Sequence, residues 1–348
     1  MMNPYQNIRK ELEDNGTAVW ADKPLADYTT FGIGGPARLL AEIRQTEHLR
    51  KAVQLACQYR VPYKIIGNGS NLIVSDSGFD GFIIINQTAK WEILGRPNKP
   101  CPSAKRKDIR FNGPRANGLF AAGLHSGPLE DVLVRVDSGL KINTLAQSLY
   151  RHGISGLQWF AGIPATVGGA IYMNMHGARR FFGDLIHSAC LTDGRKSYIV
   201  NREYFKFGYD RSILQTSKEI VLWVELCLKK GGVASARKIS KAWSRQKAIQ
   251  PQRSAGCVFQ NLRADEQERL GLPTPSIGYV IDRLLGLKGT VRGGACISSS
   301  HAAFIENKGK ATCADVLELI ELIKSKAQKE LGLELRMEAE ILGTINKE

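Results

Sequence analysis

The sequence lacks the features of a secreted, disulfide-stabilised or membrane-spanning protein. Its most apolar run, Ile220 to Leu228, is too short to span a bilayer and contains Glu225. The first 16 residues mix both charge signs without an apolar segment, so we expect no signal peptide. The seven cysteines are odd in number, widely spaced and without a Cys-x-x-Cys pair, which argues against a disulfide framework and a zinc site. We therefore expect a cytoplasmic protein with reduced cysteines and no bound metal.

Acidic residues are scarce relative to basic ones, 33 against 48, which gives a formal net charge of +15. Such an excess favours anionic partners. The densest basic run, Lys105 to Lys107 with Arg110 and Arg115, lies among Pro, Asn, Gly and Ser and is typical of a solvated loop. We therefore expect nucleotide cofactors and a phosphorylated, carboxylated substrate as partners, and no nucleic acid.

Four local patterns predict how the chain is organised. Residues 95–129 are rich in Pro, Gly, Lys and Arg without any period, which indicates an insertion. Asn143 is placed to cap a helix that ends at Gly153. The pair Gly231 and Gly232 marks the expected domain boundary. Residues 333–341 alternate apolar and polar side chains, which predicts a half-buried strand.

The stretch 156–174, GLQWFAGIPATVGGAIYMN, combines an apolar run with glycines and a proline. One interpretation is a cofactor cradle, in which Gly162, Pro164, Gly168 and Gly169 let another molecule approach the backbone closely. The other is a buried glycine-rich turn that packs against a sheet. The residues alone do not separate the two.

A second glycine-rich loop, Gly67 to Asn71 (GNGSN), follows a predicted strand at 63–66, and a further strand is expected at 82–85. Its backbone amides could hold a phosphate. An ordinary turn is equally compatible, because Asn and Gly tolerate positive φ.

Five motifs together resemble the UDP-N-acetylenolpyruvoylglucosamine reductase (MurB) family, flavoenzymes that make UDP-N-acetylmuramate for peptidoglycan. They are TTFGIGGPA at 29–37, IGNGSNLIVSDSGFDGFII at 66–84, GLQWFAGIPATVGGAIYMN at 156–174, QPQRSAGCVFQN at 250–261 and GLKGTVRGGACISSSHAAFIENKGKATCADVLELI at 286–320. The resemblance extends from about Asp27 to Gly343 and is closest to the family's shorter subtype.

The resemblance implies an α+β fold. It consists of an FAD-binding region of the vanillyl-alcohol-oxidase (PCMH) type with two subdomains, followed by an α+β C-terminal substrate-binding domain. The expected ranges are an N-terminal segment at 1–26, an FAD-binding domain at 27–231 with subdomains at about 27–87 and 88–231, and a substrate-binding domain at 232–348. The expected state of the chain is a monomer.

The resemblance also implies non-covalent FAD between the two glycine-rich segments, NADPH as the reductant and a UDP-sugar enolpyruvyl ether as the substrate. The implied cofactor-binding residues are Thr30, Gly67, Asn68, Gly69, Ser70, Asn71, Gly162, Ile163, Pro164, Thr166, Val167, Gly168 and Gly169. The implied substrate-binding residues are Tyr209, Ser254, Gln260 and Asn261.

Two catalytic positions follow from the family patterns. Cys257 lies where the family carries a serine that donates a proton, and a thiol is a far stronger acid than an alcohol. Glu338 corresponds to the family's C-terminal glutamate, whereas Glu334 and Glu340 are expected to be solvated carboxylates.

The family's catalytic arginine has no exact counterpart. The family pattern Tyr-Arg-x-Ser reads Tyr209, Asp210, Arg211, Ser212 in this chain. We expect Arg211 to act, which requires a bulge or loop to bring it to the position that Asp210 holds in strict register. Ala165 and Gln260 also replace a usual glycine and lysine.

Two other functions are compatible with the same fold. One is an FAD-linked oxidase of a sugar or alcohol, although the loop GNGSNLIVSD lacks the histidine that often tethers flavin in such enzymes. The other is a flavin-binding relative that lost activity through the change at Asp210.

Overall fold

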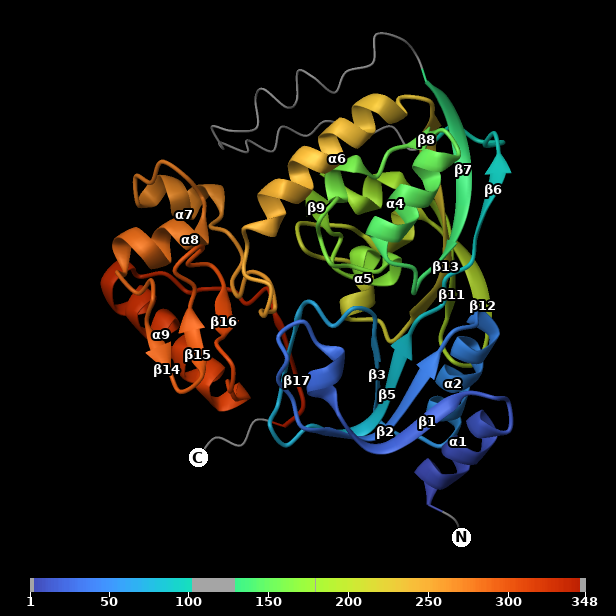
Figure 1. Cartoon of the computed structure of the whole chain (residues 1–348), viewed down its shortest axis with the longest axis horizontal. Helices are drawn as coiled ribbons and strands as arrows, with labels where there is room; N and C mark the ends of the chain where they lie inside the picture. The colour runs from blue at the N-terminus through green and yellow to red at the C-terminus, as the bar shows by residue number, and fades with distance from the viewer. Residues whose placement is uncertain (1–2, 102–128, 179, 345–348) are drawn as a thin grey trace. The chain divides into compact units, whose positions relative to one another are not determined.

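A computed structural model describes residues 3–101, 129–178 and 180–344 (Figure 1). Most of the insertion expected at 95–129 lies outside the described residues. The helices are α1 (Pro4–Glu13), α2 (Thr46–Gln58), α4 (Ile142–Arg151), α5 (Val167–Tyr172), α6 (Val233–Ala248), α7 (Ala264–Arg269), α8 (Ile277–Tyr279) and α9 (Cys313–Leu331). The strands are β1 (Ala18–Pro24), β2 (Pro36–Ile43), β3 (Tyr63–Ile66), β4 (Leu72–Val74), β5 (Phe79–Asn86), β6 (Trp91–Gly95), β7 (Glu130–Asp137), β8 (Ile154–Ser155), β9 (His176–Gly177), β10 (Arg180–Phe181), β11 (Ile186–Thr192), β12 (Ser197–Asn201), β13 (Ile220–Lys230), β14 (Val291–Arg292), β15 (Ala295–Ile297), β16 (Ile305–Asn307) and β17 (Glu340–Leu342).

The chain forms two compact units, each made of several segments. Unit 1 comprises Met1–Trp20, Leu39–Asn68 and Phe82–Lys247, and unit 2 comprises Ala21–Arg38, Gly69–Gly81 and Ala248–Glu348. The division therefore falls after α6, not at the expected boundary at Gly231. The reason is that Ala236 of α6 joins the core of unit 1 and the hydroxyls of Ser240 and Tyr150 share a hydrogen bond of 2.7 Å.

The larger sheet of unit 1 has the strand order β12-β11-β13-β7-β6, and β8 pairs with the end of β13. Its neighbouring strands are antiparallel. Because alternate side chains of a strand point to opposite faces, Val224, Leu226 and Leu228 share one face, where they join the same core as Leu145 and Leu149 of α4. Helices α4, α5 and α6 lie together on one side of this sheet (Figure 1).

A second sheet has the order β1-β2-β5-β3. Strands β3 and β5 confirm the strands predicted at 63–66 and 82–85, and they run parallel with Ile65 opposite Ile84. The apolar sides of α1 and α2 pack on this sheet through residues such as Leu12 and Leu49. The loop Gly67 to Asn71 therefore begins at the carboxyl end of a strand.

Unit 2 contains the antiparallel sheet β14-β15-β16 and the parallel pair β4 and β17, in which Ile73 lies opposite Ile341. Helix α9 starts with a capping box formed by Thr312 and Asp315. The carboxylate of Asp76 also accepts hydrogen bonds from the amides of Cys313 (2.8 Å) and Ala314 (3.0 Å). A carboxylate at a helix N-terminus satisfies unpaired amides and complements the helix dipole.

Two predictions of secondary structure are wrong in detail. The strand expected at 333–341 is restricted to Glu340–Leu342, because the amides of Glu338 and Ala339 both donate to the carbonyl of Val258 and break a regular ladder. Asn143 does not cap α4 but lies inside it. Its side chain accepts from the amide of Gly162 (2.9 Å) and donates to the carbonyl of Ile163 (3.1 Å).

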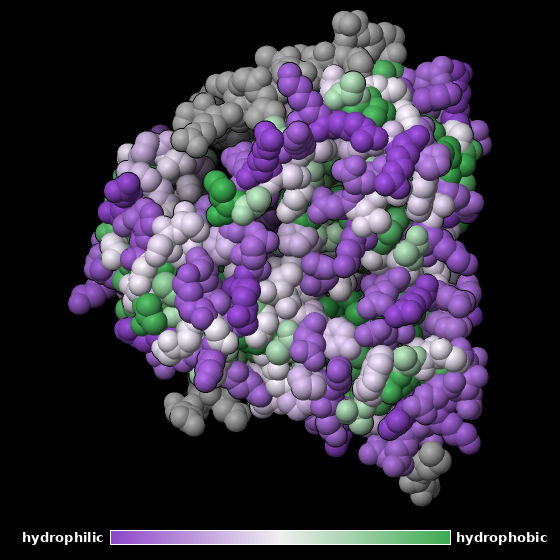
Figure 2. Space-filling model, viewed as in Figure 1, coloured by the Kyte–Doolittle hydropathy of each residue, from purple (hydrophilic) through white to green (hydrophobic). Residues whose placement is uncertain are grey.

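The surface shown in Figure 2 is mostly hydrophilic, and its apolar residues occur in small scattered groups. Within the described ranges, none of the helices has both the length and the hydropathy needed to cross a bilayer.

Candidate functional site

The two glycine-rich segments that the sequence assigns to a cofactor lie against each other in unit 1. The side chain of Asn68 donates to the carbonyl of Pro164 (3.1 Å). A Cβ atom on Gly67 would lie 2.3 Å from Oγ1 of Thr166. Glycine is therefore required at position 67 by the close approach of another part of the same chain.

The amides at the start of α5 are already used by the protein. Val167 donates to Leu140 (2.9 Å), Gly168 donates to Ser138 (2.7 Å), and Gly169 donates to Oγ1 of Thr166 (3.3 Å). A Cβ atom on Gly168 would also lie 3.1 Å from the carbonyl oxygen of Ser138. At Gly168 the structure thus supports the buried-turn interpretation, and the expectation that these amides point at a pyrophosphate is wrong.

The loop after β3 differs in this respect. In the part of the chain that the structure describes, the amides of Asn68, Gly69 and Ser70 donate to no protein acceptor. Consecutive free amides form a concave donor site for an anionic group. These donors fit the phosphates of a dinucleotide such as FAD, whereas the amides at the start of α5 do not.

Thr30 lies beside the same loop within unit 2. Its amide donates to the carbonyl of Gly69 (3.2 Å), and its hydroxyl donates to the carbonyl of Ser254 (2.7 Å). A Cβ atom on Gly69 would lie 2.0 Å from the carbonyl oxygen of Tyr28. Three predicted site residues, Thr30, Gly69 and Ser254, are thus joined by backbone contacts.

Cys257 and Glu338 are brought together by two irregularly paired segments. Phe259 lies opposite Met337, and the amide of Glu338 donates to the carbonyl of Val258 (2.9 Å). Asn71, an expected cofactor residue, donates from its side chain to the carbonyl of Glu338 (3.0 Å). Cys257 is not part of a disulfide and is half-buried, Glu338 is half-buried, and Glu334 is exposed.

Two of the predicted substrate-binding residues use side-chain atoms to hold the local backbone. The hydroxyl of Ser254 is buried and donates to Pro251 (3.0 Å), and Oδ1 of Asn261 accepts from the amide of Ile277 (3.1 Å). Gln260 is half-buried, and its amide donates to the carbonyl of Arg336 (2.9 Å).

Arg336 forms an ion pair that the sequence did not single out. Its guanidinium donates to both carboxylate oxygens of Glu266 at 2.6 and 2.8 Å. These hydrogen bonds lower the pKa of Glu266 to about 2. The pair fixes Arg336 beside Gln260 and Asn261, next to the segment that carries Cys257.

The segment expected to carry the catalytic arginine forms a tight turn. The amide of Gly208 donates to the carbonyl of Arg211 (2.9 Å), and Asp210 adopts a left-handed φ of 49°. This turn buries Asp210 to 5% exposure and leaves Tyr209 37% exposed, while Arg211 is exposed. Neither a bulge nor a loop conformation brings Arg211 inward in place of Asp210.

Sequence reasoning also missed His176, which lies just after the cradle in β9. Its Nδ1 is 3.1 Å from Oδ1 of Asp210. The only indication in the sequence was the acidic Asp210, which stands at the position where the family pattern has an arginine.

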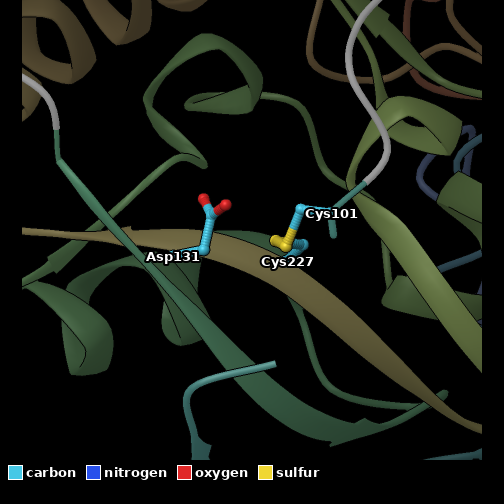
Figure 3. A group of neighbouring side chains, drawn as sticks. All are labelled: Cys101, Asp131 and Cys227. Carbon is cyan, nitrogen blue, oxygen red and sulfur yellow. A yellow bond between two sulfur atoms is a disulfide. The ribbon is translucent and has the colours of Figure 1, made fainter. Parts of the chain in front are cut away.

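A disulfide joins Cys101 to Cys227, with their Cα atoms 6.0 Å apart, and corrects the expectation that the cysteines stay unpaired. Figure 3 shows the carboxylate of Asp131 next to it. In the described ranges, these three residues are a group whose ligand atoms lie within 4.8 Å of one another, as in a metal site. The two sulfurs are bonded to each other and Asp131 pairs with Lys229, so this state offers no thiolate to a metal.

A surface hollow of about 680 Å³ is lined by Gln54, Cys57, Gln58, Arg60, Asp193, Gly194 and Arg195. None of these residues belongs to the predicted site.

Comparison with known proteins agrees with these features. Residues 249–342 match the family model described as UDP-N-acetylenolpyruvoylglucosamine reductase, C-terminal domain, and residues 123–195 match an FAD binding domain. Both confirm the fold class inferred from the motifs.

Full-length relatives are also found. The chain is 32% identical over 344 residues to UDP-N-acetylenolpyruvoylglucosamine reductase 1 of Bacillus anthracis, covering 97% of this chain and 99% of the relative. It is 33% identical over 328 residues to the reductase of Chlamydia felis, covering 93% of each. The crystal structure of the reductase from Thermus caldophilus aligns with a TM-score of 0.66 at 30% identity, covering 94% of this chain and 98% of that one. The chain therefore belongs to the UDP-N-acetylenolpyruvoylglucosamine reductase family.

Proposed function

We propose that this protein reduces UDP-N-acetylglucosamine enolpyruvate to UDP-N-acetylmuramate in peptidoglycan precursor synthesis. The observation that carries this proposal is the full-length match to reductases of this name. Bound FAD would supply the hydride-transfer chemistry of this reaction, with NADPH as the reductant. The net charge of +15 suits an enzyme whose cofactors and substrate all carry phosphate.

The loop Asn68 to Ser70 is the part of the predicted cofactor site that fits FAD best. Its three amides donate to no acceptor in the described chain, and burial of free donors is costly unless something accepts from them. Two hydrogen bonds hold this loop. The amide of Thr30 donates to the carbonyl of Gly69, and the side chain of Asn71, which follows the loop, donates to the carbonyl of Glu338. Thr166 and Gly168 act indirectly by holding the neighbouring turn in place.

The residues of the protein must stabilise the negative charge that develops on the substrate, and one of them must supply a proton. Addition of hydride to the methylene carbon of the enolpyruvyl group leaves negative charge on the adjacent carbon and its carboxylate. That carbon must then be protonated. Cys257 supplies the proton from its thiol, and Glu338, on the paired segment, assists this step. Tyr209, Gln260 and Asn261 contribute to substrate binding.

Two finer proposals concern the state and location of the protein. We infer that it acts as a monomer in the cytoplasm, without nucleic acid as a partner. The full-length agreement with enzymes of intracellular precursor synthesis supports this location. The disulfide between Cys101 and Cys227 is unusual for a reducing compartment. Size-exclusion chromatography with and without reductant tests the monomeric state, and cell fractionation tests the location.

Replacement of Glu338 tests the catalytic assignment. We expect Glu338→Ala to leave NADPH-driven flavin reduction unchanged and to slow reoxidation by the enolpyruvyl substrate by about 10²-fold or more, because the carboxylate acts only in the second half-reaction. Stopped-flow absorbance of the flavin separates the two steps. The matched control is Glu334→Ala, an exposed carboxylate on the same segment, which should do little.

Equal effects of the two variants would mean that the wrong carboxylate was chosen. Oxygen consumption with a sugar or alcohol, in place of NADPH oxidation with the enolpyruvyl ether, would instead identify an oxidase.

A further inference from the structure

We propose that Cys101, Cys227 and Asp131 form a zinc site when the bond between the two cysteines is reduced. The disulfide and the zinc complex are then two states of one group of side chains. This inference goes beyond the proposed reductase function, because none of the three residues belongs to the predicted cofactor or substrate site.

Neighbouring strands of the large sheet of unit 1 bring the three residues together. Asp131 of β7 lies opposite Lys229 of β13, and Cys227 precedes Lys229 by two residues, so these side chains share one face of the sheet. Leu228 points to the other face, where it joins the core. Cys101 follows β6, which pairs with β7, and its Cα atom lies 6.0 Å from that of Cys227.

The distances suit a metal ion of the size of zinc. One ligand atom from each residue lies within 4.8 Å of the other two, and Figure 3 shows the carboxylate beside the two cysteines. A tetrahedral zinc ion with Zn–S bonds of about 2.3 Å holds its two sulfurs about 3.8 Å apart, so the reduced sulfurs must separate by roughly 2 Å. Cys101 lies outside the strands, so its side chain can rotate while Cys227 stays in the sheet.

The ligand atoms also select the type of metal. Two thiolates and one carboxylate oxygen are ligands that zinc binds, whereas magnesium and calcium prefer oxygen alone. Cysteines that come together in a protein of a reducing compartment are more often metal-binding or catalytic than a structural cross-link. Three protein ligands leave the fourth position of a tetrahedral ion open to water, which makes the metal exchangeable.

Lys229 balances the charge of such a site. Two thiolates and a carboxylate carry three negative charges, of which a zinc ion neutralises two. The ammonium of Lys229, which pairs with Asp131, neutralises the third. Cys227 is buried, and a charged group in a buried position is costly unless it is compensated, so a neutral set of zinc, ligands and lysine fits this place in the sheet.

The conversion between the two states is a two-electron step. A dithiol reductant transfers two electrons and two protons to the S–S bond, leaves two cysteine thiols and is itself oxidised to a disulfide. Zinc then displaces both thiol protons, because only a thiolate is a metal ligand. A disulfide oxidant reverses the step by thiol–disulfide exchange: the bond between Cys101 and Cys227 forms again, the oxidant is reduced to two thiols, and zinc is released.

The test titrates zinc into the flavin-loaded protein after reduction with a phosphine, which is removed before the titration. We expect the reduced wild type to bind one zinc ion per chain in isothermal titration calorimetry, with release of protons, and the oxidised protein to bind none at this site. Cys101→Ser and Asp131→Asn should each weaken binding by at least about tenfold, because even the hydrogen-bond partner of a zinc ligand is worth about 10- to 100-fold.

Two variants serve as matched controls. Glu130→Gln removes the neighbouring carboxylate of β7, which pairs with Arg96, and Cys57→Ser removes a half-buried cysteine outside the group. Both should bind zinc as the wild type does. Cobalt(II) reports the geometry, because a tetrahedral cobalt ion absorbs red light beyond the flavin bands, and Cys101→Ser should lose this absorption. Flavin content and thermal unfolding of each variant identify any loss that comes from misfolding.

A reduced wild type that binds no zinc would overturn the proposal, and so would equal affinities of the wild type, Cys101→Ser and Asp131→Asn. A disulfide that the phosphine cannot reduce in the folded protein would also overturn it, because the thiolates could then never form. Turnover with NADPH and the enolpyruvyl ether tests the proposed reductase function separately, since the zinc site shares no residue with it.

Discussion

Cys257 combines a reactive group with a constrained backbone. Its neighbours Val258 and Phe259 are fully buried, and Cys257 itself lies opposite Phe304 in an isolated bridge. Its side chain is half-buried and takes no part in a disulfide. The buried neighbours and the bridge to Phe304 fix the backbone at Cys257. Its side chain therefore has a defined direction, which a proton donor requires.

Replacement of Cys257 tests whether the thiol donates the proton. We expect Cys257→Ala to retain flavin binding and flavin reduction but to slow substrate reduction by ~10²- to 10⁴-fold, the usual contribution of general acid catalysis. Cys257→Ser should restore much of the rate, because a hydroxyl can serve the same role. The measurement is single-turnover reoxidation of the reduced flavin.

Alkylation provides a second readout for the same residue. An alkylating reagent should inactivate the wild type, and bound substrate should slow this inactivation. A near-wild-type rate for Cys257→Ala would show that the thiol only packs and that another group, such as water, delivers the proton.

At the scale of elements, α7 is fixed to the segment that carries Glu338 by a single ion pair. Glu266 accepts two hydrogen bonds from Arg336 and one from the amide of Arg263 (2.7 Å), which also closes the first turn of α7. None of the residues of α7 is buried. Its position therefore depends on this pair more than on apolar packing.

The pair predicts a pH-dependent stability. The pKa of Glu266 falls from 4.5 to about 2 in the folded protein, so its contribution is fully present above pH 4.5 and is lost as the pH falls towards 2. We expect Glu266→Gln to lower the free energy of unfolding by about 2 kcal/mol at neutral pH. The difference from wild type should shrink across that acidic range in urea titrations.

Glu268→Gln is the control, because Glu268 is an exposed carboxylate on the same helix. It should leave the free energy of unfolding unchanged at every pH. A deficit of Glu266→Gln that persists at low pH would show that the loss comes from packing and not from the charge.

At the scale of the whole molecule, a disulfide connects distant parts of the chain. It joins two cysteines 126 residues apart, and closing a loop of this length is worth about 5 kcal/mol in the unfolded-chain model. Cys101 lies after β6 and Cys227 lies in the centre of the large sheet. The bond therefore connects Cys101, the last residue before segment 102–128, to the core of unit 1.

The way in which FAD is held leads to a further prediction. The loop 67–71 and the segment 162–169 contain neither histidine nor cysteine, the side chains through which a flavin could be tethered covalently. We expect the purified protein to be yellow and to release all of its flavin into the supernatant on acid denaturation. Flavin that stays with the precipitate, or a colourless protein that binds no added FAD, would contradict this.

Much of the fold could be predicted because its signals are local. The strands at 63–66 and 82–85 and each of the five motifs depend on residues close together in sequence, and the five motifs together indicated the family. The tertiary structure alone decided which of Asp210 and Arg211 is buried, because a left-handed φ at one residue reverses the two sides of the turn. It also decided that Gly67 and Gly168 serve close packing, that α6 belongs to unit 1 and that Cys101 meets Cys227. Each of these depends on contacts between residues far apart in the chain, which no local pattern encodes.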